Sequence, residues 1–247
     1  MKQPIKIAFR FGRQELEVGP VPLVVGALSS LAGPFPPPGR EVSCDVVEVR
    51  LDKAGCPPLW MDRCLEIQER GWPVLLTPRL KSEGGAWDEP DAQRLDIFRQ
   101  AILELAGVDI EWRSKIVHPV AMFAKLKRKV CVISYHNFDK TPPAAELASI
   151  IREAADMASI VKISTRLLSA EDEETLLSML DRKWKRPLCI IGMGAAWSHT
   201  RVSFPLFGSC LTYGYLDKPT APGQTTVAEL TRRLREEMAA SAKTEQS

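Results

Sequence analysis

Short apolar stretches alternate with amphipathic stretches along the chain, and the alternation repeats eight times. The apolar stretches are rich in Val, Ile and Leu and nearly continuous in apolar character, which is typical of strands covered on both faces in a parallel sheet. We expect these strands at Pro22–Leu28, Val46–Leu51, Val74–Arg79, Val108–Trp112, Val130–His136, Ile160–Thr165, Leu188–Gly194 and Ser209–Tyr215.

Amphipathic helices are expected between the strands. Ser169 is followed by the acidic run Glu171–Glu173, and a serine before acidic residues is typical of a helix N-terminus. Elsewhere, apolar residues recur at three- and four-residue intervals, so that they share one stripe of a helix. The stripes are Leu95, Phe98, Ile102 and Leu105; Leu147, Ile150, Ile151 and Ala154; and Val227, Leu230, Leu234 and Met238.

This repeated alternation predicts a closed (β/α)8 barrel, the TIM barrel, as a single domain over residues 1–247. An open, doubly wound sheet is the main alternative, but no glycine-rich turn follows the first strand, where Val24–Ala32 reads VVGALSSLA. The N-terminal residues predict a β-hairpin, with Ile5–Phe11 and Glu15–Val18 on either side of Gly12. We expect this hairpin to cap the bottom of the barrel, opposite its catalytic face.

Composition and charge argue against several classes of partner. Hydrophobic residues make up 45% and charged residues 26% of the chain, as in ordinary soluble proteins. The formal net charge of +2 is too small to indicate nucleic acid or an anionic membrane as the main partner. No run of about 20 apolar residues could span a membrane, and the N-terminus lacks the apolar core of a secretory signal.

The six cysteines lie far apart, at positions 44, 56, 64, 131, 189 and 210, with no C-x-x-C pair. Most of them lie in apolar surroundings, which favours reduced, buried thiols over the alternative of a structural zinc site. We therefore expect a cytoplasmic protein without a metal site.

Ionisable side chains interrupt the apolar strands close to their C-terminal ends. Those ends form the catalytic face of a barrel, and burying many charges is costly unless they pair or serve a ligand. Since every second side chain of a strand points to the same face, residues two positions apart share a face. Such pairs predict a polar, charge-balanced pocket; they are Glu48 and Arg50, Thr77 and Arg79, Asp109 and Glu111, and Ser134 and His136.

Lys162 lies in the middle of the stretch Ser-Ile-Val-Lys-Ile-Ser-Thr. If Val161 and Ile163 pack on the helices, Lys162 points into the barrel mouth. A desolvated lysine loses its charge more readily and becomes an amine nucleophile toward a ketone. On this strand alone, the alternative is a lysine near a strand end whose amine reaches water. The charged pairs on the other strands favour the nucleophile.

Short polar segments occur in a fixed order along the predicted barrel. They are Glu48–Asp52 (EVRLD), Thr77–Arg79 (TPR), Glu83–Gly85 (EGG), Asp109–Glu111 (DIE), Ser134–Phe138 (SYHNF), Thr141–Pro142, Val161–Lys162, Gly192–Gly194 (GMG), Arg201, Phe207–Ser209 and Ala221–Gln224 (APGQ). Each segment is weak by itself, but together they make the chain resemble the type I 3-dehydroquinate dehydratases, Schiff-base enzymes of the shikimate pathway. The resemblance covers nearly the whole chain, from about residue 22 to residue 224.

The resemblance implies an activity and a division of labour. Members of the family convert 3-dehydroquinate to 3-dehydroshikimate in aromatic amino-acid biosynthesis. By this resemblance, Lys162 would form the Schiff base with the substrate ketone. His136 would move the protons, Glu83 would orient the ring of His136, and Arg201 would bind the substrate carboxylate.

The resemblance also implies further substrate contacts. Arg50 is as readily a structural partner of Glu48 or Asp52 as a substrate ligand, and His118 and His199 are not expected to act in catalysis. The implied contacts are Glu48 and Arg79 at the ring hydroxyls, Arg50 beside them, Met193 and Tyr213 as an apolar wall, and Thr220, Ala221 and Gln224 on a loop that closes over the substrate.

Some positions depart from the family's pattern, although none of them is a reacting group. Thr220 stands where many members have Ser, Tyr213 stands where Phe is common, and Asn137 replaces a frequent Asp. Residues 195–200 differ from the usual small-residue pattern, which bears on the placement of Arg201.

Two other functions stay open on the sequence. Another Schiff-base barrel, an aldolase of small keto acids, would explain Lys162 but not the rest of the set. A catalytically silent barrel that binds metabolites or protein partners would need neither Lys162 nor His136. The family resemblance implies no cofactor, 3-dehydroquinate as the small-molecule partner, and a homodimer.

Overall fold

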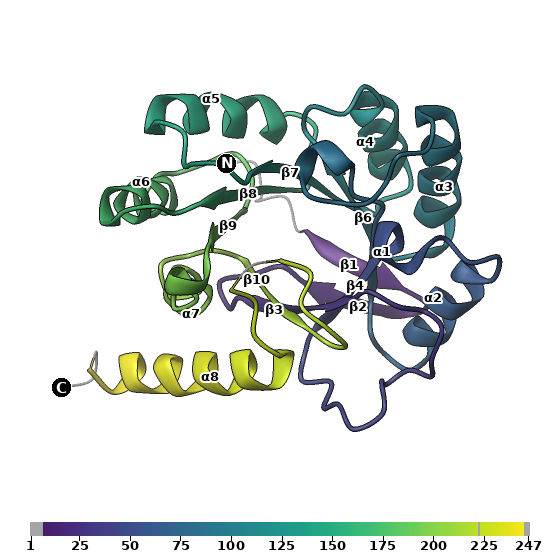
Figure 1. Ribbon diagram of the computed structural model, residues 1–247, viewed down its shortest axis with the longest axis horizontal. Helices are drawn as coiled ribbons and strands as arrows, with labels where there is room; N and C mark the ends of the chain where they lie inside the picture. Colours follow the sequence, from purple (N-terminus) through teal and green to yellow (C-terminus); the bar gives the residue numbers. More distant parts are fainter. Residues whose placement is uncertain (1–6, 222, 245–247) are drawn as a thin grey trace.

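The computed structural model describes residues 7–221 and 223–244. Eight parallel strands stand side by side in chain order, and the last strand pairs with the first of them, β10 with β3 (Figure 1). This arrangement confirms the predicted (β/α)8 barrel and rules out the open, doubly wound sheet. The strands are β3 (Leu23–Leu28), β4 (Val46–Arg50), β5 (Val74–Thr77), β6 (Gly107–Glu111), β7 (Val130–Asn137), β8 (Ile160–Arg166), β9 (Leu188–Met193) and β10 (Leu211–Tyr215).

The barrel is nearly closed at the seam between β9 and β10. The ladder is replaced there by single contacts, because Ser209 uses its hydroxyl to accept a hydrogen bond from the Ile190 N–H at 2.9 Å. The Cys210 N–H donates to the Leu188 carbonyl at 2.7 Å. These contacts explain why β10 begins at Leu211, two residues later than the predicted strand Ser209–Tyr215.

Other strand ends differ from the prediction for local reasons. Strand β5 ends at Thr77, not Arg79, because Pro78 has no N–H with which to continue a ladder. Leu51 begins helix α1 instead of ending β4. Gly194 leaves β9 with a φ of +130°, a conformation that favours glycine.

Helices cover the outside of the barrel (Figure 1). The strand faces turned toward them carry most of the buried apolar side chains, which form one core between strands and helices. The longer helices are α2 (Trp60–Glu69), α3 (Asp91–Glu104), α4 (Val117–Leu126), α5 (Ala144–Ala155), α6 (Ala170–Leu180), α7 (Thr200–Leu206) and α8 (Val227–Thr244); the short ones are α1 (Leu51–Ala54), η1 (Lys81–Glu83) and η2 (Ala195–Trp197).

The predicted helical stripes are largely present. All four residues predicted for α5 are buried, and α6 begins directly after Ser169, although the serine side chain makes no capping hydrogen bond. In α3, however, Leu95 is only half-buried, and the buried stripe runs through Arg94, Ile97 and Phe98. Leu95 still packs against the core, but Arg94 finds polar partners under the helix and takes the inner position.

The N-terminal hairpin closes the bottom of the barrel. Its strands, β1 (Ala8–Phe11) and β2 (Gln14–Glu17), are antiparallel. Phe9 and Phe11 belong to a second core inside the barrel, formed with inward-facing side chains of the barrel strands. The predicted cap is therefore confirmed, and its predicted first residue, Ile5, lies outside the described residues.

No helix in the described part of the chain is long and apolar enough to cross a membrane. All six cysteines are free thiols, and only Cys56 is not fully buried. Burial raises the pKa of Cys44, Cys64, Cys131 and Cys189 to about 12, so these thiols stay protonated at neutral pH. Among residues 7–221 and 223–244, no cluster of three or more His, Cys, Asp or Glu side chains could hold a metal ion.

Candidate active site

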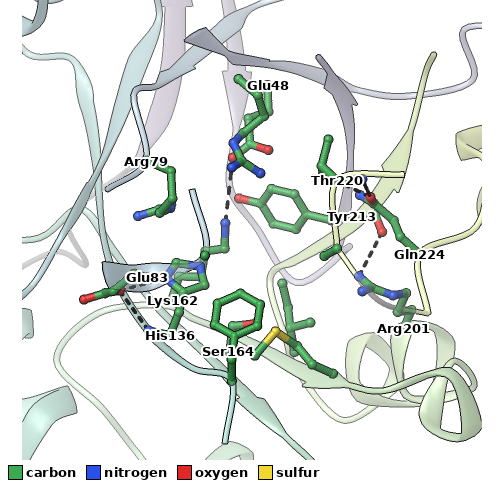
Figure 2. Close-up of a pocket in the computed structure, with 16 residues that line it drawn as sticks. Glu48, Arg79, Glu83, His136, Lys162, Ser164, Arg201, Tyr213, Thr220 and Gln224 are labelled. Carbon is green, nitrogen blue, oxygen red and sulfur yellow. Dashed lines mark hydrogen bonds and ion pairs between the residues drawn. The ribbon is translucent and has the colours of Figure 1, made fainter. Parts of the chain in front are cut away.

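One pocket opens at the C-terminal ends of the barrel strands (Figure 2). It brings together every residue to which the family resemblance gave a role, whereas Thr77, Asp109, Glu111 and Ser134 of the predicted polar pairs do not line the cavity. The lining residues with such a role are Glu48, Arg50, Arg79, Glu83, His136, Lys162, Met193, Arg201, Tyr213, Thr220, Ala221 and Gln224. Four further lining residues were not predicted: Gly84, Phe138, Ser164 and Ile191.

Lys162 points into the barrel from the middle of β8. Its neighbours Val161 and Ile163 belong to the core under the helices, so strand alternation turns Lys162 to the opposite face. The side chain is buried, which does not fit a lysine whose amine reaches bulk water. Its Nζ lies 3.1 Å from Oδ2 of Asp109 and 3.8 Å from Oε1 of Glu48.

Asp109 is the acidic partner of Lys162; the sequence predicted it for a polar pocket but gave it no role in the reaction. Burial alone would raise the pKa of Asp109, but the charges of Arg79 and Lys162 hold it well below its usual value. Asp109 is therefore a permanent anion beside the amine. The signal that could have found it was its position on the inner face of β6, which the charged pair with Glu111 already indicated.

His136 and Glu83 form a hydrogen-bonded pair at the edge of the pocket. Nδ1 of His136 lies 2.9 Å from Oε2 of Glu83, and the backbone N–H of His136 donates to the same oxygen at 3.0 Å. Two glycines make this approach possible. A Cβ at Gly84 would collide with the Phe138 ring, and a Cβ at Gly85 would lie 2.0 Å from the Arg79 carbonyl oxygen.

Burial shifts the pKa values of His136 and Glu83 in opposite directions. Burial lowers the pKa of His136 well below its usual value, and the positive charges of Arg79 and Lys162 lower it further. The imidazole is therefore neutral at neutral pH and can accept a proton. Burial raises the pKa of Glu83 to about 7, although Arg79 acts against this shift. Since Nδ1 faces Glu83, the other ring nitrogen, Nε2, is the one left for a ligand.

A buried ionic network lies under the pocket. Arg79 donates from Nη2 to Asp109 at 2.7 Å, and from Nη1 to Glu111 at 3.1 Å and to the Ser134 hydroxyl at 2.7 Å. Glu111 also pairs closely with Arg94, which reaches in from α3. The network fixes Arg79 in place and ties the pocket floor to the surrounding helix layer.

Glu48 and Arg50 line the pocket next to this network. Glu48 accepts a hydrogen bond from the Thr77 hydroxyl at 3.0 Å. Arg50 makes two hydrogen bonds to Asp52, at 3.0 and 2.9 Å, and Asp52 also accepts one from the Ala86 N–H. Of the two roles considered for Arg50, the structural pairing with Asp52 is therefore present, and the side chain still borders the cavity.

Arg201 approaches the pocket from α7. Its Nε donates to the Gly223 carbonyl and its Nη1 to the Tyr213 carbonyl, both at 3.1 Å. Burial lowers the pKa of Arg201 to about 10, which leaves the guanidinium charged at neutral pH. Residues 195–200, which depart from the family's pattern, form η2 and the start of α7. Arg201 nevertheless lines the cavity.

The loop between β10 and α8 forms one wall of the pocket. Gln224 accepts two hydrogen bonds through Oε1, from the N–H of Thr220 at 2.8 Å and from its hydroxyl at 3.0 Å. Ala221 lies within this turn and lines the cavity. The two histidines that were not expected to act lie outside: His118 is exposed on α4, and exposed His199 bonds Glu173 at 3.0 Å.

Comparisons of sequence and of structure identify relatives of the same family. Residues 38–239 match the family described as type I 3-dehydroquinase. A 3-dehydroquinate dehydratase of Methanocella arvoryzae is 37% identical over 196 residues, which cover 78% of this chain and 88% of that protein. One of Methanothrix thermoacetophila is 36% identical over 217 residues, covering 87% and 91%. The solved 3-dehydroquinate dehydratase of Enterococcus faecalis superposes with a TM-score of 0.74 at 26% identity, over 87% of this chain and 94% of that one.

Proposed function

The chain belongs to the type I 3-dehydroquinase family, and its reaction is therefore the dehydration of 3-dehydroquinate; we propose that Lys162 carries out this reaction as a Schiff base. The enzyme is a hydro-lyase of the shikimate pathway. The observation that carries the Schiff-base proposal is the position of the Lys162 amine, buried at the pocket floor beside the Asp109 anion. A buried amine close to a fixed negative charge suits the formation of an iminium cation.

The first stage joins enzyme and substrate. The Lys162 amine attacks the ring ketone, and loss of the ketone oxygen as water leaves an iminium. Asp109 lies 3.1 Å from the nitrogen that then carries the positive charge, so it stabilises that charge. The iminium withdraws electrons and acidifies the neighbouring carbon.

The second stage is the elimination. His136, kept neutral by burial and by the cations around it, takes the proton from the acidified carbon. The electron pair moves into the iminium and then back to expel the hydroxyl group, which leaves as water with the proton held by His136. Glu83 keeps the imidazole ring oriented through the hydrogen bond to Nδ1. Hydrolysis of the resulting conjugated iminium frees the product and Lys162.

The remaining lining residues bind and enclose the substrate. Arg201 binds the carboxylate through its planar guanidinium. Glu48 and Arg79 hold ring hydroxyls, with Arg50 beside them. The loop with Thr220, Ala221 and Gln224 closes over the substrate and excludes water, while Met193 and Tyr213 form the wall of the pocket.

We also propose that the barrel acts as a single domain, in the cytoplasm, as a homodimer. Six free thiols suit a reducing compartment. Large apolar side chains are exposed on the neighbouring helices α3 and α4, at Leu103, Met122 and Leu126, and a second copy of the chain would cover them. Light scattering should give twice the mass of one chain, and Met122→Lys should reduce it; the mass of a single chain in the wild type would contradict the dimer.

A direct assay tests the proposed activity. Purified protein with 3-dehydroquinate should form a conjugated enone, which is followed by its ultraviolet absorbance. Lys162→Ala should abolish this turnover. A wild-type protein that binds the substrate tightly without turnover would instead indicate the silent barrel, and turnover by Lys162→Ala would contradict the role of the amine.

A further inference from the structure

The hydroxyl group of Tyr213 lies in the pocket without a hydrogen-bond partner. It is one of only three buried side-chain polar atoms without such a partner in the described part of the chain, and the other two, on Trp87 and Ser203, do not line the pocket. Tyr213 is only 4% exposed. A buried polar group without a partner destabilises a folded protein, so such a group in a site indicates a ligand that completes it.

The Tyr213 side chain is held directly against the reacting amine. The Nζ of Lys162 lies 4.0 Å from the centre of the Tyr213 ring. Figure 2 shows the hydroxyl directed across the pocket toward the end of the Lys162 side chain. The backbone of Tyr213 is fixed by β10 and by the hydrogen bond from Arg201 to its carbonyl. The Tyr213 side chain therefore borders the space in which an atom bonded to Nζ must lie.

The two side chains that pair with the Lys162 amine cannot donate a hydrogen bond when ionised. Asp109 and Glu48 are carboxylates, and an ionised carboxylate only accepts. The Arg79 guanidinium already donates to Asp109, Glu111 and the Ser134 hydroxyl, and its proposed substrate contacts are the ring hydroxyls. The Tyr213 hydroxyl is thus a donor beside Lys162 that no acceptor of the described residues occupies.

We infer that the Tyr213 hydroxyl donates a hydrogen bond to the substrate oxygen that Lys162 displaces. This inference rests on the proposed Schiff-base function. When the amine adds to the ketone, a C–N bond forms and the oxygen becomes the hydroxyl of a carbinolamine, with the proton coming from the nitrogen. The C–O bond then breaks, and the oxygen leaves as water with one more proton from the medium. Tyr213 keeps its own proton throughout and stabilises the charge that develops on the oxygen.

The same contact serves the release of the product. Hydrolysis of the product iminium passes through the corresponding carbinolamine, so the attacking water occupies the position of the departed oxygen. Because Phe is common at this position in the family, the hydroxyl is a feature of this chain and not a requirement of the reaction. Its loss should therefore slow the formation of the adduct without abolishing turnover.

The test compares Tyr213→Phe with a matched control, Tyr215→Phe. Both substitutions remove one phenol oxygen from β10, but Tyr215 does not line the pocket. Under single-turnover conditions, borohydride quenching at successive times and mass spectrometry measure the rate of adduct formation. We expect Tyr213→Phe to lower this rate and kcat/KM by about three- to tenfold, the effect of one hydrogen bond, and Tyr215→Phe to change neither.

Thermal unfolding of the ligand-free protein is the second readout. Tyr213→Phe should unfold at the same temperature as the wild type or slightly higher, because it removes a buried donor without a partner. Equal rates of adduct formation in Tyr213→Phe and the wild type would overturn the inference. A Tyr213→Phe protein that unfolds several degrees lower would also overturn it, since the hydroxyl would then have a structural role. A wild type that forms no adduct would overturn the proposed function itself.

Discussion

Nζ of Lys162 lies 3.1 Å from Oδ2 of Asp109, and both side chains are buried. Strands β6 and β8 are not adjacent in the barrel, so this contact reaches past β7 across the curved inner face of the sheet. It sets a fixed anion against the nitrogen that becomes positively charged when the Schiff base forms. In the proposed mechanism, Asp109 therefore stabilises the charge on that nitrogen directly.

Replacing Asp109 by Asn should therefore impair catalysis while keeping the shape of the side chain. We expect kcat/KM to fall by about 10- to 100-fold, the range of a charge-assisted hydrogen bond. Arg79 also loses its anionic partner, so the free energy of unfolding should fall by about 3–5 kcal/mol. Steady-state kinetics and urea unfolding measure the two effects.

A matched control for this change is Asp156→Asn. Asp156 pairs with Lys185 at 2.7 Å, but both side chains are exposed. An exposed ion pair contributes about 0–1 kcal/mol, so this variant should resemble the wild type in both measurements. Full activity in Asp109→Asn would contradict the role of the buried anion.

The His136→Ala variant should separate the two stages of the reaction. Loss of a general base typically costs about 10²- to 10⁴-fold in rate, so turnover should fall in that range. The Lys162 amine remains, so substrate should still be trapped slowly on Lys162 by borohydride. Intact-protein mass spectrometry detects the adduct, and its complete absence in His136→Ala would contradict the division of labour between the two residues.

The pH dependence of kcat/KM should show the lowered pKa of His136. Burial, with the cations Arg79 and Lys162, disfavours the imidazolium, so the base stays neutral as the pH falls through the usual value of about 6.5. The acid limb of the profile should therefore lie below about pH 6.5. If kcat/KM falls to half at about pH 6.5 or above while the protein is still folded, the pKa of His136 is not lowered.

The buried arginine on α3 should matter more for stability than an exposed arginine on the same helix. Arg94 is fully buried and pairs with Glu111, so Arg94→Met leaves a buried carboxylate less compensated and should cost about 3–5 kcal/mol. Arg99 pairs with Asp96 at the surface, and Arg99→Met should cost under about 1 kcal/mol. Urea unfolding of both variants tests this difference, and equal losses would contradict it.

The sequence predicted the barrel because its strands are continuous apolar runs separated by amphipathic helices. It predicted the site because charged residues interrupt those runs at positions of one parity, as Glu48 and Arg50 do. Ser164 could have been added by the same rule, since it shares the face of Lys162 two positions later. Phe138 could have been added from its place next to the β7 end that carries His136.

Other features depended on contacts between distant segments. The position of Asp109 beside Lys162 follows from the curvature of the closed barrel, which no local pattern encodes. The burial of Arg94 breaks the apolar stripe expected for α3, because Pro78, Ser114 and Glu111 supply its partners from elsewhere in the chain. The unpartnered hydroxyl of Tyr213 could be recognised only once every neighbour was in place.

Borohydride reduction with 3-dehydroquinate, followed by peptide mapping, tests whether Lys162 forms the Schiff base. We expect one covalent adduct on the peptide that contains Lys162, in parallel with loss of activity, and none in Lys162→Ala. Other lysines of the chain serve as internal controls. Lys185, for example, is exposed and does not line the pocket. An adduct on a different lysine, or full turnover without any adduct, would contradict a Schiff base on Lys162.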